Sequence, residues 1–119
     1  MGAQDASEGA RSPVSTVRDG FVSVGCLDDF PLGVGREVLV GRRHIAIFRL
    51  DEGIFAIDNL CLHQAGPLCD GTVEAGVVTC PWHGWSYDIR TGILVQDGKM
   101  GVACHPTRVV GDVVQVRLA

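Results

Sequence analysis

From residue 20 onward, short apolar or alternating runs are separated by turn-forming residues, a pattern typical of β-strands. The last run is the clearest, because Val114, Val116 and Leu118 would share one face of a strand and the polar residues between them the other. Helical periodicity is nowhere sustained, and only residues 27–30 could form a helical turn. The predicted strands cover residues 21–27, 37–40, 44–50, 54–57, 77–80, 86–89, 93–95, 107–110 and 113–118.

Two of the turns between these runs predict hairpins. The segment Leu50-Asp-Glu-Gly-Ile54 joins two apolar runs, and Val110-Gly-Asp-Val113 places Gly-Asp as a two-residue loop. Regular short strands with such turns predict an all-β fold, either an antiparallel sandwich or a small barrel.

Composition narrows the class of protein. At 119 residues and 12.7 kDa the chain is expected to form one domain. Its net charge of −4 and lack of a basic stripe argue against nucleic acid as a partner. No apolar run approaches the ~20 residues of a membrane span. Residues 1–20 are polar and small, unlike a secretory signal. We therefore expect a disordered N-terminal tail at 1–20 and a cytoplasmic protein without a membrane partner.

Two short clusters carry the candidate chemistry. They are Cys61-Leu-His63 and, after sixteen intervening residues, Cys80-Pro-Trp-His83. Each pairs a thiolate with an imidazole, whereas an all-cysteine iron–sulfur site would need two more thiolates at matching spacings. Two cysteines and two histidines, with both histidines on one iron of a [2Fe–2S] cluster, are the ligands of a Rieske centre.

The flanking residues strengthen this interpretation, and the chain resembles the Rieske family over roughly residues 21–118. The matching segments read Cys61-Leu-His-Gln-Ala-Gly-Pro-Leu and Cys80-Pro-Trp-His-Gly-Trp-Ser-Tyr-Asp-Ile-Arg-Thr-Gly92. The resemblance implies a Rieske-type antiparallel β-sandwich or incomplete barrel, with an inserted cluster-binding subdomain at about 60–95. The two ligand clusters do lie between the hairpin at 50–54 and the final strands.

The resemblance also implies the ligand set. Cys61 and Cys80 would bind the inner iron of one [2Fe–2S] cluster per chain, and His63 and His83 the outer iron. The histidines would then lie at the tip of the protein, where the cofactor of a redox partner can approach.

Four residues near the ligands are expected to surround the cluster: Tyr87, Trp85, Gly84 and Pro81. By resemblance, the Tyr87 hydroxyl hydrogen-bonds a ligand sulfur, whereas Trp85 occupies a position where high-potential relatives carry a serine donor. Those relatives also carry a disulfide between positions that are Gly66 and Trp82 here. With one donor retained and no disulfide, we expect a potential low in the Rieske range.

The remaining cysteines and histidines have no ligand spacing. We expect Cys26 and Cys104 to be small buried residues, Cys69 a structural loop residue, and His44 and His105 ordinary strand or surface histidines. A structural zinc site is the alternative for the clusters, but such sites usually place both cysteines in one knuckle and both histidines in another.

The function expected from the resemblance is that of a Rieske ferredoxin, which passes single electrons from a flavoprotein reductase to a terminal oxygenase. The second motif also resembles the Rieske domain of ring-hydroxylating oxygenases, but only 27 residues follow Gly92, so no catalytic domain is expected and the chain is not an enzyme by itself. The alternatives are a small Rieske subunit of a larger oxidoreductase, such as a nitrite reductase, or a non-catalytic redox-sensing module. Partner docking is expected at the loop tips, including Gln64, Pro67, Trp82 and Trp85, although packing of Trp85 inside the subdomain is favoured.

Overall fold

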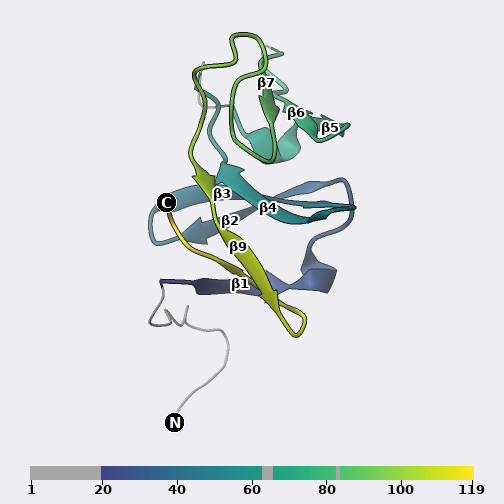
Figure 1. Ribbon diagram of the computed structural model, residues 1–119, viewed down its shortest axis with the longest axis vertical. Helices are drawn as coiled ribbons and strands as arrows, with labels where there is room; N and C mark the ends of the chain where they lie inside the picture. Colours follow the sequence, from purple (N-terminus) through teal and green to yellow (C-terminus); the bar gives the residue numbers. More distant parts are fainter. Residues whose placement is uncertain (1–19, 63–65, 83) are drawn as a thin grey trace.

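Antiparallel β-strands arranged in three sheets make up the computed structural model, which describes residues 20–62, 66–82 and 84–119 (Figure 1). The described part contains no α-helix, only two 3₁₀ turns, η1 (Leu27–Asp29) and η2 (Leu68–Asp70). This confirms the all-β antiparallel class, as an open arrangement of sheets and not a closed barrel. The strands are β1 (Val22–Cys26), β2 (Gly35–Val40), β3 (Arg43–Leu50), β4 (Gly53–Asp58), β5 (Thr72–Glu74), β6 (Val77–Thr79), β7 (Ser86–Asp88), β8 (Cys104–His105), β9 (Thr107–Val110) and β10 (Val113–Val116).

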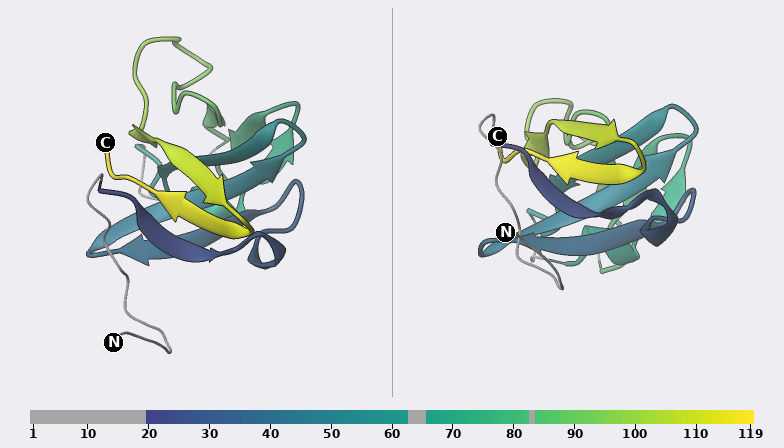
Figure 2. Two further views of the ribbon diagram at one scale, coloured as in Figure 1. Left: turned by 60° about the horizontal axis from the view of Figure 1, so that its bottom comes forward. Right: turned by 90° about the horizontal axis from the view of Figure 1, so that it is seen from below.

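The two ends of the described chain meet in one sheet, in the order β1-β10-β9, and this sheet lies across one face of the second sheet, β2-β3-β4-β8 (Figure 2). We call these two sheets the base region. An apolar core fills the space between them, with Ile45, Ile47 and Ala56 from the second sheet facing Val114 and Val116 from the first. The alternation predicted for the last strand is thus confirmed, since Val114 and Val116 are both fully buried.

The second sheet is buried on both of its faces. Successive strand residues point to opposite faces, so Ile45 and Ile47 enter the base core, whereas Ala46 and Phe48 enter a second core on the other side. All four are inaccessible to solvent. This double burial explains why β3 reads as a continuous apolar run and not as an alternating one.

The third sheet, β5-β6-β7, lies above the second sheet at the top of Figure 1. Together with the described residues 59–62, 66–71, 80–82, 84–85 and 89–103 it forms what we call the upper region. Its core, which continues onto Phe48 and Ile57 of the second sheet, contains Val78, Tyr87 and Ile89.

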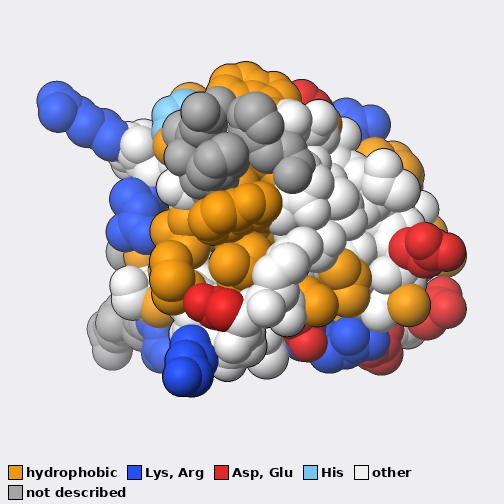
Figure 3. All heavy atoms as spheres, turned by 90° about the horizontal axis from the view of Figure 1, so that it is seen from above, with side chains coloured by type: hydrophobic (Ala, Val, Ile, Leu, Met, Phe, Trp, Pro, Cys, Tyr) orange, Lys and Arg blue, Asp and Glu red, His pale blue; other side chains and the backbone are white. Residues whose placement is uncertain are grey.

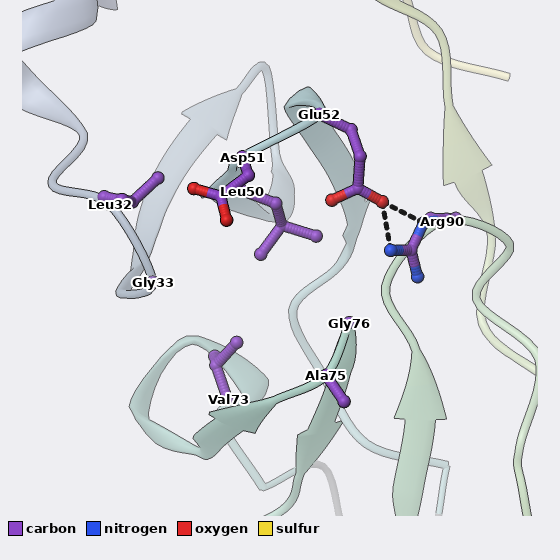
Figure 4. A pocket seen from close by; sticks show the side chains of 9 residues that line it. All are labelled: Leu32, Gly33, Leu50, Asp51, Glu52, Val73, Ala75, Gly76 and Arg90. Atoms are coloured by element: carbon purple, nitrogen blue, oxygen red, sulfur yellow. Dashed lines mark hydrogen bonds and ion pairs between the residues drawn. The ribbon is translucent and has the colours of Figure 1, made fainter.

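An ion pair at the surface also connects the two regions. Arg90 follows β7, and Glu52 lies in the β3–β4 turn. The Arg90 Nε–H donates to Glu52 Oε2 at 2.6 Å. The pair closes one end of a cleft that Leu32, Leu50 and Val73 also line (Figure 4). Both partners are more than two-fifths exposed, so the pair contributes little stability.

Both predicted hairpins are confirmed. Leu50 pairs with Gly53 across the β3–β4 turn, and Val110 pairs with Val113 across the β9–β10 turn. The helical turn predicted at 27–30 is present as η1.

The strand predicted at 93–95 is wrong. Ile93 and Leu94 form only isolated bridges, Ile93 with Gly101 and Leu94 with Tyr87. Neither pairing extends to a second residue, so no ladder forms. Two short strands, β5 and β8, lie outside the predicted strand ranges, although His105 of β8 was expected in a strand or at the surface.

The burial expected for Cys26 is also wrong, since this residue is exposed. The β1–β10 pairing shifts register between Ser23 and Gly25, which indicates a β-bulge. A bulge reverses the faces to which the following side chains point. The side chain of Cys26, at the end of this apolar run, therefore does not point into the core.

The expected tail at 1–20 falls outside the described residues except for Gly20. Within the part of the chain that the structure describes, no helix has the length and apolar character needed to cross a membrane.

Candidate metal centre

The two cysteines of the motifs lie in neighbouring segments of the upper region. Cys61 follows the end of β4 by three residues, and Cys80 follows β6 directly. Both belong to the same apolar core and are only 4% and 3% exposed. The fold thus brings together two thiols that are nineteen positions apart and shields both from water.

Backbone hydrogen bonds close each cysteine segment into a tight loop. The Cys61 N–H bonds to Gly66 O at 2.8 Å, which spans the first motif. In the second, the Cys80 N–H bonds to Trp85 O at 2.7 Å, and the Gly84 N–H bonds to Cys80 O at 3.2 Å. Gly84 has a φ of +77°, which favours glycine at this turn.

The two loops touch at Gly66. A Cβ atom at this position would lie 2.7 Å from Cys80 Sγ and 3.1 Å from the Trp82 ring. Only a residue without a side chain fits there, so the missing side chain at Gly66 leaves room against the Cys80 sulfur.

Tyr87 joins the first loop to the third sheet. Its hydroxyl oxygen accepts the Leu62 N–H at 3.0 Å and lies 3.2 Å from Cys61 Sγ. Since the Leu62 N–H occupies an acceptor site of the hydroxyl, the hydroxyl proton of Tyr87 can point to the Cys61 sulfur. Burial, together with the contact to Cys61, raises the pKa of Tyr87, so the hydroxyl stays protonated and can donate. The sequence predicted a hydrogen bond at this hydroxyl, and the contact with Cys61 Sγ is present.

The expected positions of the other motif residues can be compared only in part. His63, Gln64 and His83 lie outside the described residues. Trp85 is partly buried and packs against the upper core, as favoured from the sequence, whereas Trp82 is 55% exposed. Pro81 and Gly84 are exposed.

Sequence reasoning missed Asn59, which organises the first loop. Asn59 is 1% exposed, its backbone O accepts the Leu68 N–H and its Oδ1 accepts the Cys69 N–H, both at 2.7 Å. Its Nδ2 donates to Glu37 Oε2 at 2.7 Å, which ties the loop to β2. The polar pair Asp58-Asn59 between an apolar run and Cys61 was the only signal in the sequence.

A hydroxyl pair closes the second loop and was also missed. Thr79 and Ser86 are paired across β6 and β7, and their side-chain oxygens are 2.9 Å apart. They flank the second motif on both sides, which is the feature that could have drawn attention to them.

Of the remaining cysteines, Cys26 is exposed, whereas Cys69 and Cys104 are partly buried against the upper core. Burial raises the pKa of the Cys69 and Cys104 thiols, which favours their protonated forms. Cys104 is only partly buried, and its thiol donates to Arg90 O at 3.3 Å.

Both other histidines lie in strands, as expected. His105 is buried in β8, where its Nε2 donates to Asp58 Oδ1 at 2.8 Å and its Nδ1 accepts the Ala119 N–H at 3.0 Å. His44, in β3, lies at the surface 2.8 Å from Glu37 Oε2.

Apolar side chains surround the exposed side of the two loops. Leu60, Leu62 and Trp82 are 42%, 44% and 55% exposed. Seen from above, apolar side chains gather next to the residues that are not described (Figure 3).

The fold and the paired loops define a small all-β protein with two buried thiols and a phenolic donor at one end. The chain belongs to the Rieske [2Fe–2S] domain family, whose model matches residues 20–106. Membership implies a Rieske-type [2Fe–2S] cluster, and the described residues fit one: two shielded sulfurs, room at Gly66 and a protonated hydroxyl at a sulfur.

Similar proteins carry ferredoxin names. The chain is 34% identical over 96 residues to the anthranilate 1,2-dioxygenase ferredoxin subunit of Burkholderia cepacia. The matched region covers 80% of this chain and 89% of the other. The ferredoxin of carbazole 1,9a-dioxygenase from Nocardioides aromaticivorans IC177 superposes with a TM-score of 0.77 at 27% identity, over 83% of this chain and 98% of the other.

A third similar structure bears another name. It is a putative NADH-dependent nitrite reductase small subunit from Mycobacterium tuberculosis, with a TM-score of 0.75 at 26% identity, over 83% of this chain and 96% of the other.

Proposed function

We propose that this chain is a ferredoxin-type carrier of single electrons, the electron-transport component of an oxidoreductase system and not itself an enzyme. Cys61 and Cys80 hold the inner iron of one Rieske [2Fe–2S] cluster per chain, and His63 and His83 hold the outer iron. The observation that carries the proposal is the Tyr87 hydroxyl, 3.2 Å from the sulfur of a buried motif cysteine. The cluster supplies one-electron chemistry at about −150 to +300 mV, above all-cysteine plant-type clusters at about −400 mV.

The described residues prepare the site for an added electron. Reduction makes the cluster more negative, and a hydroxyl that donates to a ligand sulfur stabilises that charge. Tyr87 supplies this donor, whereas Trp85 offers no hydroxyl at the position where high-potential relatives have a serine. With the Tyr87 donor kept and the serine donor replaced by Trp85, the potential stays low within the Rieske range.

The partners are a flavoprotein reductase and a terminal oxygenase, as the dioxygenase names of the relatives suggest. Electron transfer needs close approach, and the exposed apolar side chains of Leu60, Leu62 and Trp82 offer a contact surface next to the ligand loops. Docking there also includes Gln64 and Pro67. The protein acts in the cytoplasm and binds neither nucleic acid nor membrane.

The domain boundaries belong to the same proposal. Residues 21–118 form the Rieske domain, in which about 60–95 make up the cluster-binding subdomain, and residues 1–20 form a disordered tail. The separate sheet β5-β6-β7, within this range, supports the division.

The test is reconstituted electron transfer. The purified protein should be red-brown, with two irons and two acid-labile sulfides per chain, and should couple a flavoprotein reductase to a Rieske oxygenase in a turnover assay. A colourless protein with stoichiometric zinc, or a red protein that no reductase can reduce, would contradict the proposal.

Two variants test the docking surface. Trp82→Ala should retain the cluster but slow its reduction by the reductase, whereas Val110→Ala should not. Val110 is a matched control, because it is 54% exposed but lies at the β9–β10 turn of the base region. Equal rates for both variants would remove Trp82 from the docking site.

The nitrite reductase similarity favours a second candidate, a small Rieske subunit of a larger oxidoreductase. Such a subunit should co-purify from native lysate with a large catalytic subunit in fixed proportion. A carrier, in contrast, should elute alone and exchange between its reductase and its oxygenase. A redox-sensing module would form a stoichiometric complex without turnover.

A further inference from the structure

The side chain of Gln96 bonds to the backbone on the C-terminal side of the second motif. Its Nε2 donates to Gly84 O at 3.2 Å, and its Oε1 accepts the Ser86 N–H at 3.1 Å. One amide group thus satisfies a carbonyl and an N–H two residues apart, and only one orientation of the amide does so. Gln96 is exposed, so this pairing is not a by-product of core packing.

This contact completes the restraint of Gly84, the residue directly after His83. The Gly84 N–H already bonds to Cys80 O at 3.2 Å. With its carbonyl bonded to Gln96, both polar groups of Gly84 are fixed, one by the loop itself and one from outside. The inner bonds tie the loop to Cys80, and the Gln96 side chain adds two bonds from a separate segment of the chain.

The loop that carries Gln96 is rigid enough to act as a support. Asp97 Oδ1 accepts the N–H groups of Lys99 and Met100 at 2.8 and 3.0 Å. Leu94 is 4% exposed and anchors the loop in the upper core, while its carbonyl accepts the Gly98 N–H at 2.8 Å. Gln96 therefore belongs to a loop that its own hydrogen bonds close and that Leu94 fixes in the upper core.

We propose that Gln96 is a positioning residue that fixes the His83 segment and so sets the orientation of this ligand at the cluster. The inference rests on the proposed function, because it needs His83 to be an iron ligand. Without the Gln96 amide, the carbonyl of Gly84 and the N–H of Ser86 would turn to water, and the segment could adopt more than one position. The iron–histidine geometry would then vary from molecule to molecule.

The experiment compares Gln96→Leu with Gln115→Leu in the cluster-loaded protein. Leu has nearly the volume of Gln but no amide. Gln115 is the matched control, since its side chain also bridges two partners, Arg108 Nε at 2.7 Å and Ser23 Oγ at 3.1 Å, in the base region. The readouts are the EPR spectrum of the reduced protein, the reduction potential by film voltammetry and the rate of cluster loss to a chelator.

Gln96→Leu should keep two irons per chain but show broadened EPR lines, a displaced potential and cluster loss about tenfold faster, the factor that one lost hydrogen bond produces. Gln115→Leu should leave all three unchanged. Gln96→Glu, which keeps the acceptor for Ser86 but cannot donate to Gly84, should also broaden the lines.

The outcomes separate the two levels of the argument. If wild-type protein shows no Rieske spectrum, the proposed function falls and this inference with it. If wild-type protein shows the spectrum but Gln96→Leu and Gln96→Glu have the same line widths and potential, the positioning role alone is overturned. A variant that is merely less stable, with an unaltered spectrum, would count against it in the same way.

Discussion

The base region and the upper region are built from different kinds of residue. Between the two base sheets the core is aliphatic and aromatic, with Ile45, Ile47 and Phe30 among its buried members. The upper core instead includes Cys61, Cys80 and Tyr87, so the residues that carry the chemistry are also packing residues.

The protein thus separates the region that provides stability from the region that carries the chemistry. The base region can bury its apolar surface without any cofactor, whereas the upper region has three strands of only three residues each and two ligand loops. Such a region has few backbone ladder bonds of its own. We infer that the base folds independently and that the cluster supplies much of the order above it.

Removing a ligand should produce the largest effect and divide the two regions most clearly. Cys80→Ser should lose the cluster completely, and the amides of the upper region should then exchange quickly with solvent. Amides of β3 and β4 should stay protected, because one face of each strand packs on the base core, which contains no ligand. Hydrogen exchange measured residue by residue checks this. Equal loss of protection in both regions would break the comparison.

A cavity in the base core should give the converse result. Ile47→Ala should lower the free energy of unfolding by about 2–5 kcal/mol, because it removes a fully buried side chain. The reduction potential should stay that of wild type. The matched control is Leu39→Ala on neighbouring β2, whose side chain is 57% exposed and should cost far less. A shifted potential in Ile47→Ala would show that the base tunes the cluster.

Removing the Tyr87 hydroxyl, which is both buried in the upper core and next to a ligand sulfur, should change stability and reduction potential by a moderate amount. Tyr87→Phe removes the donor to Cys61 Sγ and leaves the Leu62 N–H without its acceptor. We expect a loss of about 1–3 kcal/mol in stability and a lower potential, since the reduced state loses its donor. Denaturant titration and film voltammetry measure the two. An unchanged potential would mean that the hydroxyl does not donate to the sulfur.

The smallest effect concerns pH and the base region alone. Burial of the Asp58 carboxyl opposes its ionisation, but hydrogen bonds from His105 and Arg43 outweigh this and lower its pKa. A lowered pKa stabilises the fold above the unfolded value of ~3.9, and this contribution is lost as pH falls through the folded value. Asp58→Asn should therefore be about 1 kcal/mol less stable at pH 7, with the difference shrinking below about pH 4.

Unfolding curves at several pH values check this prediction. A difference between wild type and Asp58→Asn that stays constant down to pH 3 would show that the charge of Asp58 contributes nothing. Glu37, whose pKa is lowered mainly by its bond from Asn59, remains in both proteins and cancels from the comparison.

The sequence predicted the long strands and their hairpins because burial repeats along them. In β3 and β4 every second residue enters the same core, and the β9–β10 turn has the Gly-Asp pair that a two-residue loop needs. Short elements escaped this reasoning. Strand β8 has two residues, paired only with Ala56 and Ile57, and such a segment has no periodicity to detect.

The sequence predicted which residues make up the candidate site, but it did not predict all the contacts that hold them in place. Spacing and flanking residues led to Cys61, Cys80 and Tyr87, and the structure brings these together. Nothing in the spacing pointed to Asn59 or Gln96, because each acts through backbone groups of a segment remote from it in sequence. Such partners depend on how loops pack, which local pattern does not encode.

The most direct test of the central claim is electron–nuclear double resonance on the reduced protein. Two strongly coupled nitrogens of histidine rings on one iron are expected, and labelling histidine alone with ¹⁵N should change both couplings. His63→Cys should lose one of them if any cluster is retained, whereas His44→Ala, at the surface of β3, should lose none. A reduced [2Fe–2S] signal without histidine nitrogen coupling, or one whose couplings persist in His63→Cys, would contradict the account.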